Sequence, residues 1–304
     1  LSIPFFRWGS GLLLLVAFIP LLLIEDEIYA RKNYVKEHPR SRQKPGKLAP
    51  WAMLSFGFWV LLTTYWVYYA TWIGIVASVI VNAGYMTLIF WLFHLTKRRL
   101  GPRLGKASLL MYWMAFEFLY IRAQVNFPWL ILGYGFANDV SLIQWYEITG
   151  SLGGSLWVLL VNLSLFSLIR KWRHEGRPAS LAKLKTWILG HRALAGRSLA
   201  LILIPIIFSL FRFVSYEEEG KAYEVVVLQP NIDPWLKFND MPQAEQTDRL
   251  IRVADSLITP KTEYLVGPET FINRNMWHDQ LKQHPDIQKI KAFLSAYPRA
   301  KMVI

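Results

Sequence analysis

The residue of this sequence best placed to do chemistry is a glutamate that follows a short apolar run. Tyr264-Leu265-Val266 is typical of a buried strand, and it leads directly into Gly267-Pro268-Glu269-Thr270. Functional groups gather where the strands of a layered sheet end, so the Glu269 carboxylate is a candidate general base. The alternative is a solvated turn residue or a charge at a helix N-terminus, which position alone favours.

Cysteine chemistry is excluded within this chain, and a metal site is not expected. The sequence has no cysteine, so it offers no disulfide, no zinc-thiolate cluster and no thiol nucleophile. We expect neither a metal site nor a cofactor, because none of the six histidines shows a ligand spacing such as His-x-x-x-His: His38, His94, His174, His191, His278 and His284.

The elements that position these residues lie in two regions that are suited to different solvents. The chain is 54% hydrophobic and 15% aromatic, which is too apolar for one soluble domain of 304 residues. Long apolar blocks precede Val214, whereas charged and polar residues recur every few positions from Ser215 onward. The net charge of +13 comes from short basic runs between apolar blocks without a nucleic-acid-binding motif, so we expect no nucleic-acid partner.

Residues 1–214 are predicted to form a helical membrane domain. A helix needs about 20 apolar residues to cross roughly 30 Å of hydrocarbon. Trp51–Leu95 contains no Asp, Glu, Lys or Arg and is too long for one span, so we divide it near Ala70–Gly74 into a helical hairpin. Six spans are expected, at 11–24, 51–70, 74–95, 108–121, 152–169 and 198–214.

The basic residues orient these spans. The connections 25–50, 97–106 and 170–197 hold seven, five and eight Lys or Arg residues, while 70–74 and 123–151 hold none. Lys and Arg accumulate in cytoplasmic connections. With six spans, both the N-terminal end and residues 215–304 are therefore expected outside the cytoplasm.

Two features of the membrane region go beyond simple anchoring. Glu117 and Arg122 lie in or at the end of a span, where they either form a charge pair that fixes the helix or help to handle a lipid head group. The second feature is the uncharged aromatic loop Asn126–Phe136, which contains Trp129. We expect this loop on or in the outer leaflet, and its alternative is an aromatic belt.

Residues 215–304 are predicted to be an α/β domain. Strand, helix, strand, helix, strand is the alternation of a layered sheet. The elements are Tyr223–Gln229, followed by the turn Pro230-Asn231, then Met241–Ile258, Tyr264–Val266, Pro285–Ala296 and a strand from Lys301.

Motifs of both regions follow one another in a recognisable order. The α/β region contains Val227-Leu228-Gln229-Pro230-Asn231-Ile232, Lys237-Phe238 and Gly267-Pro268-Glu269-Thr270, and the membrane region contains Trp66-Val67-Tyr68, Glu117-Phe118-Leu119, Phe127-Pro128-Trp129 and Gly133-Tyr134. In order and spacing they resemble the apolipoprotein N-acyltransferase family of the carbon–nitrogen hydrolase (nitrilase) superfamily. The resemblance covers the whole chain.

The resemblance implies a fold and an activity. Residues 215–304 would be the first part of an αββα nitrilase-like domain on the periplasmic side of a bacterial inner membrane. The implied reaction moves a fatty acyl chain from a phospholipid, through a Cys thioester, to the N-terminal amine of a diacylglyceryl-cysteine on an apolipoprotein. Phospholipid, diacylated apolipoprotein and membrane lipids are thus the implied partners.

The family's Glu-Lys-Cys triad maps only in part. Glu269 matches the triad Glu by motif, whereas the family's Lys and Cys follow well downstream, and no Lys of this chain is assigned. We expect the chain to be truncated at both ends, and to insert in a membrane yet transfer no acyl group by itself. Trp129, Glu117 and Phe238 are the candidate substrate or lid residues.

Two residues depart from the family pattern. Phe238 stands where some members carry a Trp that shields the active site, so it is either a lid residue or an ordinary core residue. Gly267 likewise replaces a Trp seen before the Pro-Glu pair in some members.

Two rival functions remain open. The first is another membrane-anchored nitrilase-like enzyme or a polyprenol-linked glycosyltransferase partner on the same scaffold. The second is a transporter or membrane scaffold whose outer domain only binds, although the internal repeats expected of a transporter are not evident.

The basic connections give a prediction about orientation. A reporter enzyme that is active only outside the cytoplasm is expected to work when fused after Ser215 and to fail when fused near Arg177, because Arg177 lies in the most basic connection. Activity with the reverse pattern would show that the topology is inverted.

Overall fold

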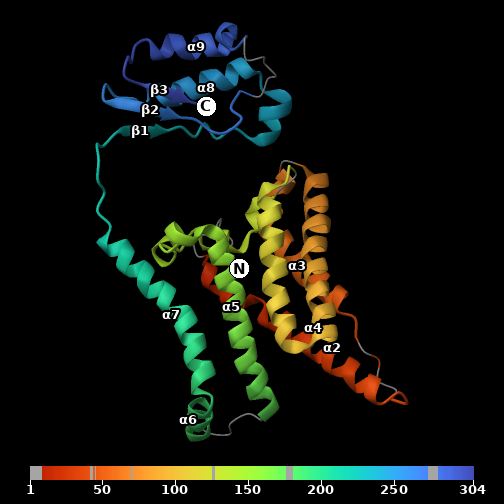
Figure 1. Ribbon diagram of the computed structural model, residues 1–304. Coiled ribbons are helices and arrows are strands. Elements are labelled where there is room, and N and C mark those ends of the chain that lie inside the picture. The colour runs from red at the N-terminus through yellow and green to blue at the C-terminus, as the bar shows by residue number, and fades with distance from the viewer. Residues whose placement is uncertain are drawn as a thin grey trace. The chain divides into compact units, whose positions relative to one another are not determined.

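The structure is a computed structural model that describes residues 9–41, 44, 46–69, 71–124, 127–175, 181–272 and 280–304, with the backbone alone described for 181–185. The chain divides into two compact units, Leu1–Tyr216 and Glu217–Ile304. Figure 1 shows the helices and strands of both units, and each unit has its own hydrophobic core. We call the first the membrane unit and the second the α/β unit.

The membrane unit is a bundle of helices formed by the apolar blocks of the sequence. Its helices are α1 (Leu14–Ala17), α2 (Ile19–Glu37), α3 (Leu48–Thr64), α4 (Trp72–Arg122), α5 (Tyr146–Glu175), α6 (Leu181–Gly190) and α7 (Arg192–Ser215). Within the described residues, four helical segments are long and apolar enough to cross a membrane: Leu48–Tyr69, Trp72–Arg122, Tyr146–Glu175 and Arg192–Ser215.

Helix α4 is itself a hairpin of two arms. Its 51 residues would extend about 76 Å as one straight helix, more than twice the thickness of a membrane's apolar core. The helix breaks at Gly101, whose φ of 86° favours glycine. Beyond the break the chain returns, because the Tyr120 hydroxyl donates to Asn82 and the rings of Tyr85 and Phe116 lie 6.0 Å apart. The predicted spans 74–95 and 108–121 fall on the two arms.

The predicted span 11–24 is interrupted rather than continuous. A 3₁₀ turn (Gly11–Leu13) and α1 precede α2, with a break at Phe18. Asn162 of α5 fills the break, because its Oδ1 accepts from the Phe18 amide at 2.9 Å and its Nδ2 donates to the Leu14 carbonyl at 2.7 Å. This segment is not among the four long apolar ones, since the second half of α2 is charged. The count of six membrane crossings therefore stays a prediction. Ala70, at the predicted hairpin connection, lies outside the described residues.

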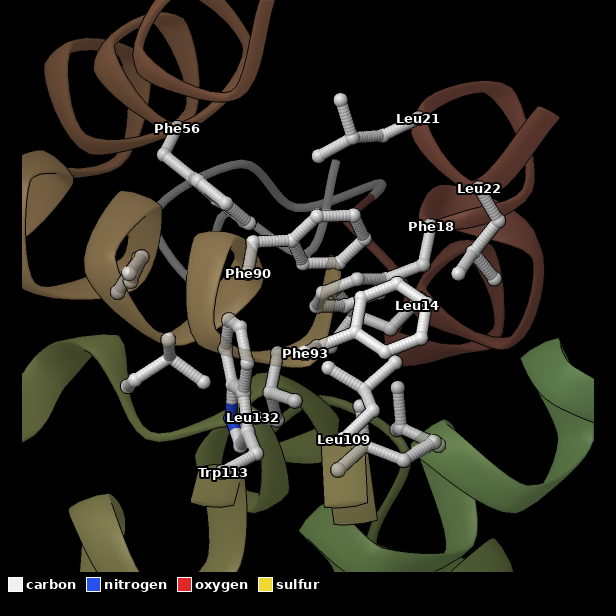
Figure 2. Packing of buried hydrophobic residues seen from close by; sticks show 14 of the residues in the cluster. Leu14, Phe18, Leu21, Leu22, Phe56, Phe90, Phe93, Leu109, Trp113 and Leu132 are labelled. Carbon is white, nitrogen blue, oxygen red and sulfur yellow. The ribbon is translucent and has the colours of Figure 1, made fainter. Parts of the chain in front are cut away.

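Aromatic rings join the helices at the centre of the membrane unit. The Phe18 ring meets that of Trp113 at 5.1 Å, and Phe56 lies 5.7 Å from Trp113 and 5.8 Å from Phe90. Figure 2 shows these rings converging with Leu132, from the connection between α4 and α5. Close packing of this kind holds helices together in lipid, where burial of apolar surface gives little drive.

The α/β unit has the predicted alternation of strands and helices. Its elements are β1 (Glu224–Val227), a π-helical turn (Leu236–Asp240), α8 (Gln243–Asp255), β2 (Thr262–Val266), α9 (Pro285–Leu294) and β3 (Lys301–Val303). The three strands are parallel in the order β1-β2-β3, with Val227 beside Val266. Parallel strands end at the same edge, so the turns that follow β1 and β2 are neighbours.

One face of this sheet is covered and the other is open. The core cluster of the α/β unit includes Leu250 of α8 and Leu265 of β2, and Phe293 of α9 packs against it. On the other side, Val225 and Val227 remain 49% and 71% exposed. In a parallel sheet both faces are normally covered, so these valines mark a surface that is still open within this unit.

Candidate functional site

Two strained turns lie side by side at the carboxyl edge of the sheet. Asn231, after β1, has a φ of 50°, and Thr270, after β2, has a φ of 56°. Left-handed backbone is tolerated by Asn but is costly for a β-branched Thr. The strain at Thr270, beside a second left-handed turn, points to a functional site, because strain persists only where the surroundings fix it.

A cavity of about 230 Å³ opens between these two turns and the π-helical turn. It is lined by Gln229, Pro230, Asn231, Ile232, Pro234, Lys237, Phe238, Pro268 and Phe271. The motifs singled out in the sequence thus meet in three dimensions: the Pro-Asn turn, the Lys-Phe pair and the Gly-Pro-Glu-Thr turn. A π-helical turn is rare and is frequently found at functional sites.

Lys237 connects this cavity to Glu269. Its Nζ donates a hydrogen bond of 3.4 Å to the backbone carbonyl of Glu269 and lies 5.3 Å from the centre of the Phe238 ring. Burial lowers the pKa of Lys237 below its ordinary value, while the negative charge of Glu269 acts in the opposite direction. The site therefore holds a partly buried ammonium near the Glu269 carboxylate.

Glu269 and Phe238 are both exposed. The Glu269 side chain is open to solvent beside the cavity and is not among the described residues that line it. This position leaves it able to accept a proton from a group that approaches from outside. Phe238 is 58% exposed, so it is not a core residue of the α/β unit, and its lid role stays a prediction.

Glu117 lies deep in the membrane unit and holds the aromatic loop. The carboxylate is 1% exposed, and its Oε1 accepts from Trp113 Nε1 at 2.9 Å and from the Leu132 amide at 3.0 Å. Ser155 adds a further interaction with the same side chain. One carboxylate thereby links the aromatic core, the second arm of α4 and the loop.

A charge pair between Glu117 and Arg122 is not formed, so that interpretation is wrong. Arg122 is exposed and lies over the Phe118 ring, 3.8 Å from its centre. The two residues are five apart, which places them on different faces of a helix, whereas Trp113 is four residues from Glu117 and shares its face. A head-group role is not supported either, because the carboxylate is turned inward onto Trp113 and Leu132.

The aromatic loop forms two 3₁₀ turns, Pro128–Leu130 and Leu132–Phe136, on this support. Trp129 is 51% exposed, and its ring lies 5.5 Å from that of Trp66 and 4.9 Å from that of Phe127. At Gly133 the loop backbone comes so close to α5 that an added Cβ would lie 1.9 Å from the Ser151 carbonyl oxygen. Asn126 lies outside the described residues.

Two apolar cavities adjoin this loop. One, of about 280 Å³, is lined by Phe18, Phe56, Trp59 and Leu132, among others. The other, of about 360 Å³, is lined by Trp59, Trp129 and Tyr134, among others. Both also share Leu14, so together they form an apolar region between α1, α3 and the loop that suits a hydrocarbon chain.

A buried ion network was missed in the sequence. Glu25 is fully buried, with Oε1 2.7 Å from His94 Nδ1 and Oε2 2.5 Å from Lys97 Nζ. Asp26 pairs with Lys97 at 3.0 Å and with Arg170 at 2.8 Å. The sequence indicated only that Lys97 and Arg170 belong to basic connections and that His94 lacks a metal-ligand spacing. The available signal was His94 and Lys97, three residues apart and therefore on one helix face.

In the part of the chain that the structure describes, no three His, Asp or Glu side chains are grouped as metal ligands. In the α/β unit the candidate site residues are a carboxylate, an ammonium and aromatic side chains at the sheet edge, and the membrane unit separately holds the two apolar cavities.

The sequence of this chain is similar to those of known proteins from one family. The model of the apolipoprotein N-acyltransferase N-terminal domain matches residues 1–164. The apolipoprotein N-acyltransferase of Chlorobaculum tepidum is 24% identical over 278 residues, which is 90% of this chain and 50% of the relative. That of Geobacter metallireducens is 28% identical over 279 residues, 89% of this chain and 49% of the relative. The chain spans about half the length of the curated relatives it matches, and the matches extend beyond the membrane unit into the α/β unit.

The position of Glu117 predicts how the aromatic loop responds to mutation. Glu117→Ala removes the acceptor of the Leu132 amide, so exchange of that amide with deuterium is expected to accelerate at least about tenfold. Glu117→Gln keeps a carbonyl acceptor and is expected to exchange within about threefold of the parent. Hydrogen-exchange mass spectrometry of the detergent-solubilised protein measures both.

Glu147→Gln is the matched control, because Glu147 is an exposed acid that pairs with Arg212 and does not contact the loop. Unchanged exchange at Leu132 in Glu117→Ala would mean that the loop is held by its other contacts.

Proposed function

This chain belongs to the apolipoprotein N-acyltransferase family, and we propose that it takes part in moving a fatty acyl chain from a phospholipid to the N-terminal amine of a diacylated apolipoprotein. The observation that carries the proposal is the meeting of the Gly-Pro-Glu-Thr turn with Lys237 and Phe238 at one cavity. The family assignment supplies the reaction, and the site supplies a carboxylate suited to it.

The proposed reaction has two acyl transfers. In the first, a thiolate attacks the phospholipid ester, the ester C–O bond breaks, and an acyl-thioester and a lysophospholipid form. In the second, the apolipoprotein amine attacks the thioester, so an amide forms and the thiol is released. The thiol belongs to a cysteine that these 304 residues do not contain.

Glu269 is proposed as the general base of both steps. A thiol at neutral pH is mostly protonated, so a carboxylate that takes its proton produces the nucleophile. The proton then passes to the departing lysophospholipid oxygen, and in the second step Glu269 takes a proton from the amine. Its exposed carboxylate, beside a strained turn, supports this role. Lys237 is proposed to hold the turn through the Glu269 carbonyl.

The membrane unit is proposed to deliver the acyl donor. An acyl chain avoids water, so it needs an apolar route from lipid toward the base. The cavities beside Trp59 and the exposed ring of Trp129 support such a route. Phe238 is proposed to cover the acyl group at the α/β unit, as a lid.

The proposed location is the inner membrane of a bacterium, with the α/β unit in the periplasm. The lysine and arginine distribution supports this orientation, because 20 such residues lie in alternate connections and none in the others. The parallel strand-and-helix order of the α/β unit is also what the first part of an αββα nitrilase-like domain requires.

The base assignment predicts the effect of Glu269→Gln. This change keeps the shape of the side chain and removes the proton acceptor, so acyl-thioester formation by the full-length enzyme should fall at least about 10²-fold. Glu263→Gln, on the strand that precedes the same turn, is the matched control and should retain activity. Gel-based detection of the acylated enzyme after incubation with labelled phospholipid measures this. Near-normal thioester formation in Glu269→Gln would assign the base to another residue.

The delivery route predicts a substrate-dependent effect of Trp129→Glu. A charge at this exposed aromatic position should weaken use of phospholipid, because charged groups are costly where the loop meets lipid. Reaction with a soluble thioester donor should be unaffected. Trp72→Glu is the control, since Trp72 is 62% exposed but lines neither cavity. Equal loss with both donors would indicate misfolding rather than a blocked route.

A further inference from the structure

Two helices of the membrane unit run in parallel and in register. The Phe18 amide at the start of α2 donates to Asn162 of α5, and eight residues further along both helices Asp26 pairs with Arg170 at 2.8 Å. The two contacts advance by the same number of residues along both helices, so the helices are parallel. The following turn of each helix must therefore also face the other.

The following turn of each helix carries an arginine, Arg31 on α2 and Arg173 on α5. The two arginines line one cavity of about 540 Å³. Its remaining wall includes Leu23, Ile24 and Ile28 of α2, together with Trp51 near the start of α3. The cavity therefore has cationic groups, an apolar floor and an indole that is 51% exposed.

The positive charge of this cavity is only partly compensated. Glu27 pairs with Arg31 at 2.8 Å, but both side chains are more than half exposed, so the pair is weak. Arg173 forms no ion pair within the described residues. The neighbouring acids Glu25 and Asp26 are already neutralised by Lys97 and Arg170. Two guanidinium groups thus face one exposed carboxylate.

We propose that this cavity binds the head group of an anionic glycerophospholipid. The guanidinium groups of Arg31 and Arg173 bind the phosphate, which matches their planar donor geometry. The leucine and isoleucine side chains take the upper acyl chains, and the Trp51 indole lies at the boundary between lipid and water. The apolar floor selects a lipid over a soluble phosphate.

The place of the cavity in the bundle supports a lipid occupant. Arg31 and Arg173 come from two of the basic connections, 25–50 and 170–197, and the apolar helix α3 starts at Leu48 beside them. Basic groups at the end of membrane helices attract anionic lipids of the adjacent leaflet. The cavity lies away from the aromatic loop and shares no lining residue with the two apolar cavities there, so the proposal is independent of acyl transfer.

The test is lipid binding to the detergent-solubilised full-length protein, followed by native mass spectrometry. Phosphatidylglycerol and phosphatidylcholine with the same acyl chains are titrated separately. Phosphatidylglycerol is expected to bind at least about tenfold more tightly, and the Arg31→Gln/Arg173→Gln double variant is expected to lose that difference. Arg99→Gln/Arg103→Gln removes the same charge from exposed residues that do not line the cavity, and it is expected to bind as the parent does.

A second variant tests the apolar floor without changing charge. A Cβ added at Gly46 would lie 3.4 Å from Ile28 Cγ1, an ordinary contact, so the side chain of Gly46→Leu is expected to fit and to fill part of the cavity. It is expected to weaken phosphatidylglycerol binding by about tenfold. Unchanged binding in both cavity variants, or an equal loss in the Arg99/Arg103 control, overturns the proposal. Displacement of the lipid by an equal concentration of glycerophosphoglycerol, the soluble head group, would show a phosphate site and overturn the lipid assignment.

Discussion

Backbone that departs from a helix inside an apolar bundle needs hydrogen-bond partners, because lipid supplies none. The membrane unit meets this requirement with polar side chains from neighbouring helices. Asn162 serves the break between α1 and α2, and Glu117 receives the Leu132 amide. At the next residue, Gly133, the amide donates to Ser155 Oγ at 2.9 Å, and the carbonyl accepts from the Tyr146 hydroxyl at 2.9 Å. Neighbouring side chains therefore satisfy the backbone of Leu132 and Gly133 in this irregular loop.

The loop that these bonds hold forms part of the wall of both adjoining cavities. Leu132 is held by Glu117 and buried among the aromatic rings of the core, so the wall that it gives to one cavity does not depend on a ligand. Trp129 belongs to the same loop but remains half exposed. A rigid wall with an exposed aromatic edge costs little reorganisation when a hydrocarbon chain enters, which is the benefit of preorganisation.

Sequence patterns predicted the helices, strands and turns whose formation depends on neighbouring residues along the chain. Uninterrupted apolar runs indicated the long helices, and the run Tyr264–Val266 before a Gly-Pro pair indicated β2 and its turn. Patterns along the chain say little about which distant residues meet. The network of Glu25, His94 and Lys97 joins residues about 70 positions apart, so it was not predicted. The predicted pairing of Glu117 with Arg122 was wrong because residues five apart lie on different faces of a helix. Trp113 is four residues from Glu117, shares its face and donates to it.

The two units place opposite demands on their functional groups. A general base must exchange protons with polar partners, and Glu269, the base that we propose, is exposed at a sheet edge where Thr270 and the Lys237 hydrogen bond fix the backbone around it. A hydrocarbon chain avoids water, and the two apolar cavities of the membrane unit are lined mainly by aromatic and aliphatic side chains. Fixing the backbone while leaving the carboxylate free is what a base needs, because its orientation is then set by the turn and its protonation by the reacting partner. Glu117, a carboxylate in the membrane unit, instead accepts hydrogen bonds from the Leu132 amide and the Trp113 indole through its Oε1, so these contacts join the loop to the helix core.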